Sequence, residues 1–261
     1  MKTLTALVLA GTRAGGDPLA SGEGVSHKAL IAIAGRAMIE HVVRALDAVP
    51  EIGRIVIAIE RPGVLDDLPG LRAPACRHPV SVVAAAEGPS ASVASVLARE
   101  GVPLLVTTAD HPLLRPEWIR HLLDAAPADA DATVALASRG SVTAAARGTR
   151  RTYLRFVEGE YSGCNLFLLL RPGATGVVDL WRQLEMDRKR PLRLMLRLGP
   201  GFALRYALGR LRLEQALAKL ERASGARVAV VELADGRAAI DVDKPDDLQL
   251  VRRLMGGGAQ V

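Results

Sequence analysis

Short apolar runs alternate along this chain with segments of helical periodicity, and this alternation limits the possible folds more than any other feature. The apolar runs lie at residues 4–10, 54–59, 81–86, 103–108, 133–138, 166–170 and 228–233. Helical spacing or a helix-starting proline marks residues 37–48, 90–99, 116–125 and 245–255. Strands that are buried on both faces are continuously apolar, and helices must cover both of those faces. We therefore expect an α/β, Rossmann-like fold with a mostly parallel sheet between two layers of helices.

Two further features complete the expected architecture. Asp235-Gly236 separates apolar runs at 228–233 and 238–242, which is typical of a tight turn and predicts a late antiparallel hairpin. With 261 residues, of which 49% are hydrophobic and 24% charged, the chain has a globular composition and enough length for one large core. We expect a single domain over residues 1–261, with a basic helical insertion at about 182–222.

The formal net charge of +6 belongs to that insertion. Residues 182–222 contain eleven Lys and Arg against four Asp and Glu, a balance of +7, so the remainder of the chain sums to about −1. Such a local concentration argues against a general nucleic-acid-binding surface. The chain has only two cysteines, Cys76 and Cys164, which is too few for a disulfide scaffold. This low number fits a protein of the reducing cytoplasm.

A glycine-rich loop, AGTRAGGDPLASGEGVSHK, follows the first apolar run and extends from Ala10 to Lys28. In open α/β sheets, ligands bind beyond the carboxyl ends of the strands, and glycines there let backbone N–H groups approach a phosphate. The loop fits neither G-x-x-x-x-G-K-[ST] nor G-x-G-x-x-G. It could still bring Arg13 and Lys28 to a nucleotide's phosphates. On composition alone, a plain surface loop is the alternative.

Carboxylates follow two of the later apolar runs. Asp110 comes just after the run at 103–108, and Asp241 and Asp243 alternate at the end of 238–242. Alternate residues of a strand point to the same side, so Asp241 and Asp243 are expected to lie together. Hard carboxylate oxygens at strand ends suit a Mg²⁺ ion that bridges phosphates. Each aspartate alone would also fit a turn cap or a solvated strand end, but with the glycine loop they favour a nucleotide site.

In this order, the motifs resemble those of the MobA-like NTP transferases, a nucleotidyltransferase family with a glycosyltransferase-A type fold. The resemblance covers nearly the whole chain and rests on LVLAG at 7–11, HKALIAIAGRAMIEHVV at 27–43, EGPSASV at 87–93, VTTADHPLL at 106–114, YSGCNLFLL at 161–169 and IDVDKPDDL at 240–248. It implies a Mg²⁺-dependent enzyme that transfers an NMP from an NTP to a small phosphorylated acceptor and releases pyrophosphate.

The resemblance also implies a role for each matching residue. The nucleotide-binding residues would be Leu9, Ala10, Gly11, Lys28, Gly88 and Ser92. Gly163 and Asn165 look like the acceptor-side wall, and Asp110, Asp241 and Asp243 would hold the metal. The catalytic residues would be Lys28, Arg13 and Asp110. The chain departs from the family pattern at Thr12, where a second glycine is frequent, and in the long spacing from Gly11 to Lys28.

In the segment 188–220, RKRPLRLMLRLGPGFALRYALGRLRLEQALAKL, basic and apolar residues interleave. Gly199-Pro200-Gly201 should divide it into two helical pieces. It could lie on an anionic membrane or cover a lipid-like acceptor. Alternatively, it could pack on the sheet as a helical hairpin with solvated arginines. The first interpretation adds a peripheral contact with the inner face of the membrane to an otherwise cytoplasmic protein.

Two other functions fit parts of the same pattern. A glycosyltransferase of this fold would use a nucleotide-sugar, but such enzymes usually carry Asp-x-Asp in mid-chain, where this chain has Thr-Ala-Asp-His at 108–111. A catalytically silent membrane-surface module would not need Lys28, Asp110 and Asp243. The sequence identifies neither the base nor the acceptor nor the oligomeric state.

Overall fold

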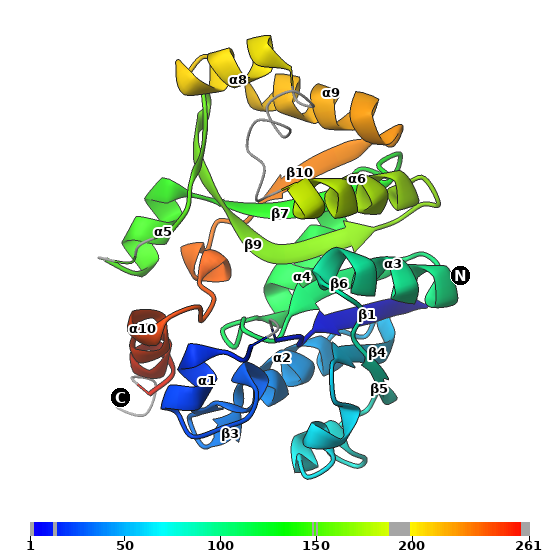
Figure 1. Cartoon of the computed structure of the whole chain (residues 1–261), viewed down its shortest axis with the longest axis vertical. Coiled ribbons are helices and arrows are strands. Elements are labelled where there is room, and N and C mark those ends of the chain that lie inside the picture. The colour runs from blue at the N-terminus through cyan, green and yellow to red at the C-terminus, as the bar shows by residue number, and fades with distance from the viewer. Residues whose placement is uncertain (1–2, 13–14, 148, 150, 188–198, 257–261) are drawn as a thin grey trace.

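The computed structural model describes residues 3–12, 15–147, 149, 151–187 and 199–256, and its centre is a mixed sheet of eight strands (Figure 1). Seven strands follow the order β10-β7-β9-β6-β1-β4-β5, and β8 pairs with β9 outside this path. The strands are β1 (Leu4–Leu9), β4 (Ile52–Ile59), β5 (Val80–Ala84), β6 (Leu104–Thr108), β7 (Ala132–Ser138), β8 (Leu154–Phe156), β9 (Gly159–Leu169) and β10 (Val228–Glu232). A separate two-stranded ribbon joins β2 (Ala32–Ile33) to β3 (Arg36–Ala37).

The sheet is mostly parallel, as the sequence predicts. β1 lies parallel to both β4 and β6, β4 to β5, and β7 to β10, whereas β9 runs antiparallel to its neighbours β6 and β7. The carboxyl ends of β1, β4, β5 and β6 therefore meet at one edge. Because β9 runs the other way, the residues near its start lie toward that edge.

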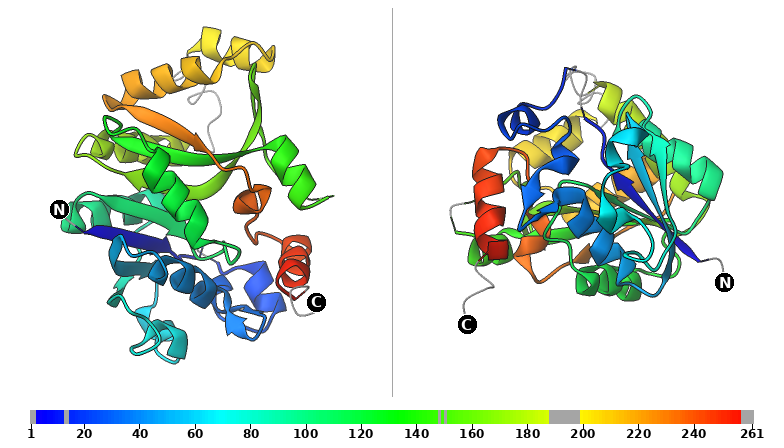
Figure 2. Two further views of the ribbon diagram at one scale, coloured as in Figure 1. Left: turned by 180° about the vertical axis from the view of Figure 1, so that it is seen from behind. Right: turned by 90° about the horizontal axis from the view of Figure 1, so that it is seen from below.

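Helices cover both faces of the sheet because successive residues of its strands point to opposite sides. On one face, Leu7 and Val56 pack with α3 (Pro89–Glu100) and α6 (Ala174–Asp187). On the other, Val8 and Ile57 pack with α2 (Met38–Asp47) and α4 (Pro116–Ala125). Figures 1 and 2 show these helix pairs on opposite sides. The continuous apolar runs of the sequence thus correspond to strands buried on both faces.

A third apolar cluster supports the edge where the carboxyl ends meet. It joins α1 (Pro18–Gly22), the β2–β3 ribbon and α10 (Pro245–Gly256) through side chains that include Ile31, Ile33, Met38, Val242 and Val251. Arg252 of α10 also forms an ion pair with Glu23, which follows α1. The glycine-rich loop and the C-terminal aspartate motif are therefore held side by side.

A late antiparallel hairpin is present, but Asp235-Gly236 does not form it. β8 and β9 make the hairpin, whereas β10 joins β7 in parallel and is followed by the short helix η4 (Gly236–Ala239). Asp235 caps η4 by accepting from the Arg237 N–H at 3.0 Å. A Cβ atom on Gly236 would lie 2.2 Å from the backbone carbonyl of Ser141. This Asp-Gly pair therefore serves helix capping and close packing rather than a hairpin turn.

Most of the described part of the basic segment is helical, with an interruption at residues 208–212. Gly199 is the N-cap of α8 (Pro200–Ala207) with a φ of 86°, and α9 (Leu213–Ser224) follows. α8 thus begins at the predicted boundary, Gly199-Pro200, while the helical piece predicted before it falls on residues 188–198, which lie outside the described residues. The remaining helices are α5 (Arg139–Ala145), η1 (Lys28–Leu30), η2 (Pro62–Leu65) and η3 (Pro69–Leu71). No helix in the described ranges is long and apolar enough to cross a membrane.

Candidate active site

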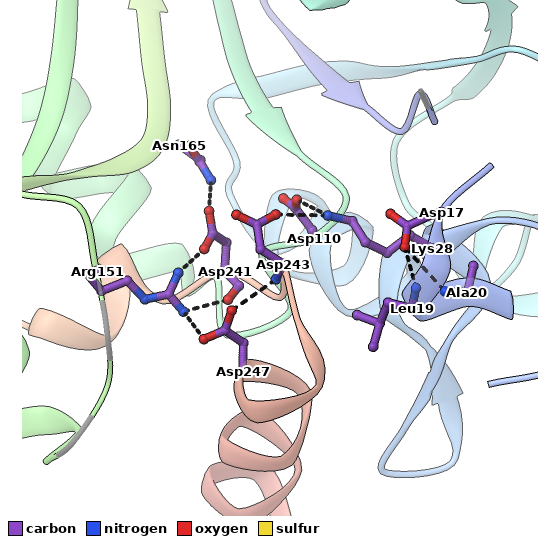
Figure 3. Close-up of polar contacts among 10 residues, drawn as sticks. All are labelled: Asp17, Leu19, Ala20, Lys28, Asp110, Arg151, Asn165, Asp241, Asp243 and Asp247. Atoms are coloured by element: carbon purple, nitrogen blue, oxygen red, sulfur yellow. Dashed lines mark hydrogen bonds and ion pairs between the residues drawn. The ribbon is translucent and has the colours of Figure 1, made fainter. Parts of the chain in front are cut away.

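The centre of the candidate site is an ammonium group between two carboxylates from distant parts of the chain (Figure 3). Lys28 Nζ lies 2.7 Å from Asp110 Oδ2 and 3.2 Å from Asp243 Oδ1. Lys28 is the first residue of η1, and Asp110 follows β6. The Val242 N–H donates to the Asp110 carbonyl at 2.8 Å, which ties the two aspartate segments together. The structure thus brings together three residues that the motifs singled out separately.

The charges of this group support one another. Burial lowers the pKa of Lys28, but the carboxylates of Asp110 and Asp243 outweigh that effect and hold the pKa above its ordinary value. The lysine is therefore a permanent cation at neutral pH. Asp110 Oδ1 is buried, and no described residue forms a hydrogen bond with it. A buried oxygen of this kind is a candidate acceptor for a ligand or a metal.

A second group of contacts surrounds Asp241. Arg151 contacts the Asp241 carboxylate, donates to its backbone carbonyl at 2.7 Å, and lies 3.1 Å from Asp247 Oδ1. Asn165 donates to Asp241 Oδ2 at 2.8 Å. Asp247 in turn accepts from the Asp243 N–H at 3.3 Å. These contacts fix the aspartate motif to the start of α10 and to β9.

Asn165 reaches Asp241 through an irregularity in β9. The register with β7 shifts between the pairs Val134–Phe167 and Leu136–Gly163, so β9 carries extra residues there. Asn165 adopts a φ of 48°, a left-handed conformation that asparagine tolerates better than most residues. Such bulges re-aim side chains and are frequent beside active sites. The Gly-x-Asn motif thus places the amide of Asn165 against Asp241, and Gly163 is exposed on the same strand.

Asp241 lies in an unfavourable environment for a negative charge. Burial and the neighbouring Asp110 and Asp243 raise the pKa of its carboxyl to about 6, although Arg151 and Asn165 act in the opposite direction. Three aspartates therefore compete for few counter-charges. A bound cation would relieve this repulsion.

The glycine-rich loop begins directly beside this group. The Ala10 N–H donates to Ala58 of β4 at 2.9 Å, and the Leu9 carbonyl accepts from Ala109 at 2.9 Å. The Thr12 N–H contacts Glu60, and a Cβ atom on Gly11 would lie 3.2 Å from Glu60 Oε1. Leu9, Ala10 and Gly11 thus leave the sheet next to the residue before Asp110. Arg13, expected to be catalytic, lies outside the described residues.

Gly88 and Ser92 stabilise the turn that leads into α3. Gly88 is the N-cap with a φ of 107°. The Ser92 hydroxyl accepts from the Ala86 N–H and donates to the Gly88 carbonyl, both at 3.0 Å, so it holds the turn itself. Glu185 of α6 lies over this turn and accepts from both the hydroxyl and the N–H of Ser90, the latter at 3.2 Å. A carboxylate from α6 therefore lies where the family resemblance places the base or ribose.

The predicted metal site is not a preformed cage. Among the described residues, no three His, Cys, Asp or Glu side chains are arranged to hold a metal ion. Asp241 is instead engaged by Arg151 and Asn165. The site still fits Mg²⁺ in part, because Mg²⁺ commonly uses one or two carboxylates together with substrate phosphates. Asp110 and Asp243 offer such a pair, and Asp110 Oδ1 is a buried oxygen without a hydrogen-bond partner in the described chain.

Sequence reasoning missed Arg151, Asp247 and Glu185. The first two had a weak signal, because a basic pair precedes β8 and an acidic pair opens α10. Glu185 had none, since it is one of several charged residues in the basic segment. His111, by contrast, is fully buried next to Asp110 and stacks on Trp118. Its pKa falls to about 4 because of burial, so it is neutral at physiological pH.

A glycine-rich loop, a lysine and paired aspartates at the carboxyl edge of a mostly parallel sheet define an α/β enzyme of the nucleotidyltransferase type. A model of the MobA-like NTP transferase domain matches residues 6–240. The chain belongs to this family. Among proteins with curated functional descriptions, none matches the sequence significantly.

Solved structures share the fold. A hypothetical transferase from Thermus thermophilus is 31% identical with a TM-score of 0.79, covering 94% of this chain and 99% of its own. A CMP:2-keto-3-deoxy-manno-octonic acid synthetase in complex with CTP is 18% identical with a TM-score of 0.60, covering 98% and 99%. The 4-diphosphocytidyl-2C-methyl-D-erythritol synthase from Anaerococcus prevotii is 11% identical with a TM-score of 0.59, also covering 98% and 99%. The last two likenesses show the fold alone.

Proposed function

We propose that this enzyme transfers an NMP from an NTP to a small phosphorylated acceptor in a Mg²⁺-dependent reaction. An acceptor oxygen would attack the α-phosphorus, and a new P–O bond would form there. The bond from the α-phosphorus to the oxygen bridging to the β-phosphorus would break, and pyrophosphate would leave. No enzyme nucleophile is required. The observation that carries this proposal is the placement of Lys28 between Asp110 and Asp243 at the sheet edge.

In this proposal the chain acts by positioning and by charge. Leu9, Ala10 and Gly11 would cradle the nucleotide with their backbone, and Gly88 and Ser92 would shape the pocket for its base or ribose. Lys28 would bind the phosphates, joined by Arg13, and would hold negative charge as it develops on the leaving pyrophosphate. Asp110 and Asp243, with Asp241 beside them, would hold Mg²⁺, which when bound neutralises phosphate charge and favours in-line geometry.

The acceptor would bind on the β9 side of the aspartates. Gly163 is exposed there, and Asn165 faces Asp241 across the gap between β9 and the C-terminal motif (Figure 3). One solved structure with the same fold holds CTP. This supports an NTP as substrate, but it does not select the base.

A pyrophosphate-release screen tests the proposal. Each of the four NTPs is combined with a panel of sugar, polyol and amino-alcohol phosphates, with Mg²⁺ or with EDTA. We expect pyrophosphate from one NTP–acceptor pair only when Mg²⁺ is present. Asp110→Asn should lower that turnover at least about tenfold, whereas Asp246→Asn at an exposed position should not.

Two results would contradict the proposal. Consumption of a nucleotide-sugar without pyrophosphate would make the enzyme a glycosyltransferase of the same fold. Full turnover in EDTA, or in the Asp110→Asn variant, would show that the reaction does not depend on a metal ion held by Asp110.

A further inference from the structure

Most of the exposed large hydrophobic side chains in the described residues belong to the β8–β9 hairpin and the α8 region. In the described ranges, the large hydrophobic residues that are exposed all lie between positions 154 and 208, and they are Leu154, Val157, Met186, Leu204, Tyr206 and Leu208. Leu204 and Leu208 of the α8 region are 60% and 58% exposed. They are four residues apart and therefore share one side of the helix. This arrangement differs from single exposed leucines scattered over a surface, which need no explanation.

The turn of the β8–β9 hairpin contacts the segment that joins α8 to α9. The Val157 N–H, in the turn of the hairpin, donates to the Leu211 carbonyl at 2.9 Å, and Glu158 accepts from the Leu213 N–H at 3.0 Å. Figure 1 and the left view of Figure 2 show α8 at the far end of this hairpin, away from α2 and α10. We call this the α8 surface, defined by Leu154, Val157, Leu204, Tyr206 and Leu208.

Arginines lie among these apolar side chains. Arg205, Arg210 and Arg212 are exposed, whereas the exposed Arg155 already forms an ion pair with Glu160 at 3.0 Å. Within the described residues, no carboxylate forms an ion pair with Arg205 or Arg210. Cations kept next to exposed leucines create a surface that is both apolar and positive. Anionic phospholipid is the partner that matches both properties, because guanidinium groups bind phosphates and apolar side chains enter the interface.

Other partners fit this surface less well. A second copy of the chain would bring the same arginines face to face, because a two-fold interface is made of the same patch twice. A nucleic acid would neutralise the arginines but leave the leucines and Val157 without an apolar partner. We therefore propose that the α8 surface docks reversibly on an anionic phospholipid bilayer.

The α8 surface and the candidate site are connected by β9. β9 runs from Gly159, at the hairpin turn, to Asn165, which contacts Asp241. Six residues of strand span about 20 Å at roughly 3.3 Å per residue. If the proposed function holds, the acceptor side therefore lies within about 20 Å of the hairpin turn at which we propose docking. The docking itself does not depend on that function.

Vesicle co-sedimentation of the full chain tests the proposal. We expect the wild-type protein to sediment with phosphatidylcholine–phosphatidylglycerol vesicles at low salt, to detach at high salt, and not to bind phosphatidylcholine vesicles alone. Each basic residue near such a surface strengthens binding about fivefold. Arg205→Gln with Arg210→Gln should therefore weaken binding roughly 25-fold, and Leu204→Gln with Leu208→Gln should weaken it at every salt concentration at which the wild type still binds.

A matched control tests whether vesicle binding depends on the arginines of this surface or only on the net charge of the protein. Arg36→Gln with Arg72→Gln removes the same charge at exposed positions elsewhere and should retain wild-type binding. Circular dichroism melts confirm that each variant is folded, and pyrophosphate release with a soluble acceptor should be unchanged in all of them. Pyrophosphate release and vesicle binding are measured in separate experiments. The proposed enzymatic function and the proposed membrane docking can therefore fail independently.

Three results would overturn the proposal. The first is wild-type protein that stays in solution with anionic vesicles at low salt. The second is equal loss of binding in the control pair and in the Arg205/Arg210 pair. The third is a dimer in analytical ultracentrifugation that the Leu204/Leu208 pair abolishes while vesicle binding persists, which would assign the surface to a second copy.

Discussion

Lys28 Nζ lies 2.7 Å from Asp110 Oδ2, although 82 positions separate the two residues in the chain. The same nitrogen also reaches Asp243, so one cation links the glycine-rich loop, the end of β6 and the C-terminal aspartate motif. Without that cation, two carboxylates would face one another. The lysine thus stabilises the very edge at which we propose that phosphates bind.

Replacing Lys28 should weaken nucleotide binding. Lys28→Ala removes a charge-assisted contact with phosphate, which contributes about 1.5–3 kcal/mol, or roughly a 10- to 100-fold change in Kd. Isothermal titration of the preferred NTP measures this change. Lys244→Ala, next to Asp243 but without an ion pair in the described chain, is the matched control. Equal NTP affinity together with equal turnover in wild type and Lys28→Ala would leave the lysine a purely structural role.

Ionisation of Asp241 should make the metal-free protein less stable as pH rises. An ordinary aspartate pKa is 3.8, and that of Asp241 is about 6 because of burial and of Asp110 and Asp243. Below pH 3.8 the carboxyl is protonated in both folded and unfolded chains, so it carries no penalty. The penalty grows as the unfolded chain ionises first, and it is complete above about pH 6, at on the order of 3 kcal/mol.

Urea unfolding of wild type and Asp241→Asn across this pH range, in EDTA, measures that penalty as a difference. We expect the wild type to lose stability relative to the variant between about pH 4 and pH 6. Added Mg²⁺ should reduce the loss if it binds beside Asp241. A difference between the two proteins that stays constant with pH would contradict the raised pKa.

Arg151 should be the main structural support of the aspartate motif. It is almost fully buried and contacts both Asp241 and Asp247. Removing one partner of a buried ion pair costs about 3–5 kcal/mol, because the remaining charge is left uncompensated. Arg151→Gln should therefore lower the free energy of unfolding by about 3 kcal/mol, whereas Arg155→Gln, on the exposed side of β8, should change it little.

A double-mutant cycle distinguishes this support from general damage. If Arg151 acts through Asp247, then Arg151→Gln combined with Asp247→Asn should cost less than the sum of the two single changes. Additive costs would mean that the observed 3.1 Å contact carries no coupling.

The sequence anticipates the parallel half of the sheet better than the antiparallel half. The strands β1, β4 and β6 are continuous apolar runs, and Pro116 marks the start of α4 where it occurs. β9 begins at Gly159, far earlier than the apolar run at 166–170 indicates, because its first half is polar and glycine-rich. A strand exposed near a ligand site lacks the apolar pattern by which strands are recognised.

The candidate site shows the same division. The sequence motifs predict that Lys28, Asp110 and Asp243 belong to the site. Each of them follows a strand or precedes a helix at the same edge of an α/β sheet. Arg151 could not be found in this way, since it lies in an irregular segment and its partners are 90 and 96 positions away. The hairpin predicted at Asp235-Gly236 was wrong for a related reason. Gly236 is needed because it packs closely against the backbone of α5, and no local sequence pattern reveals this contact.

Glu185 should contribute to recognition of the nucleotide. Its Oε2 accepts from Ser90, and its Oε1 lies 3.0 Å from where a Cβ atom of Gly88 would be. No described residue donates a hydrogen bond to Oε1. A carboxylate is an acceptor only, so it favours ligand groups that donate, such as base amino groups or ribose hydroxyls. We propose that Oε1 accepts from the NTP bound beside Gly88 and Ser92.

On this basis, Glu185→Gln should lower kcat/KM for the preferred NTP about tenfold, because a hydrogen bond to a charged group contributes about 1.5–3 kcal/mol. Comparing that NTP with its 2′-deoxy form then separates ribose from base: a variant that loses its preference for the ribonucleotide has lost a contact with the ribose. Glu117→Gln, exposed at the start of α4, is the matched control. If Glu185→Gln lowers only the free energy of unfolding and leaves kcat/KM unchanged, Glu185 serves solely as a cap for α3.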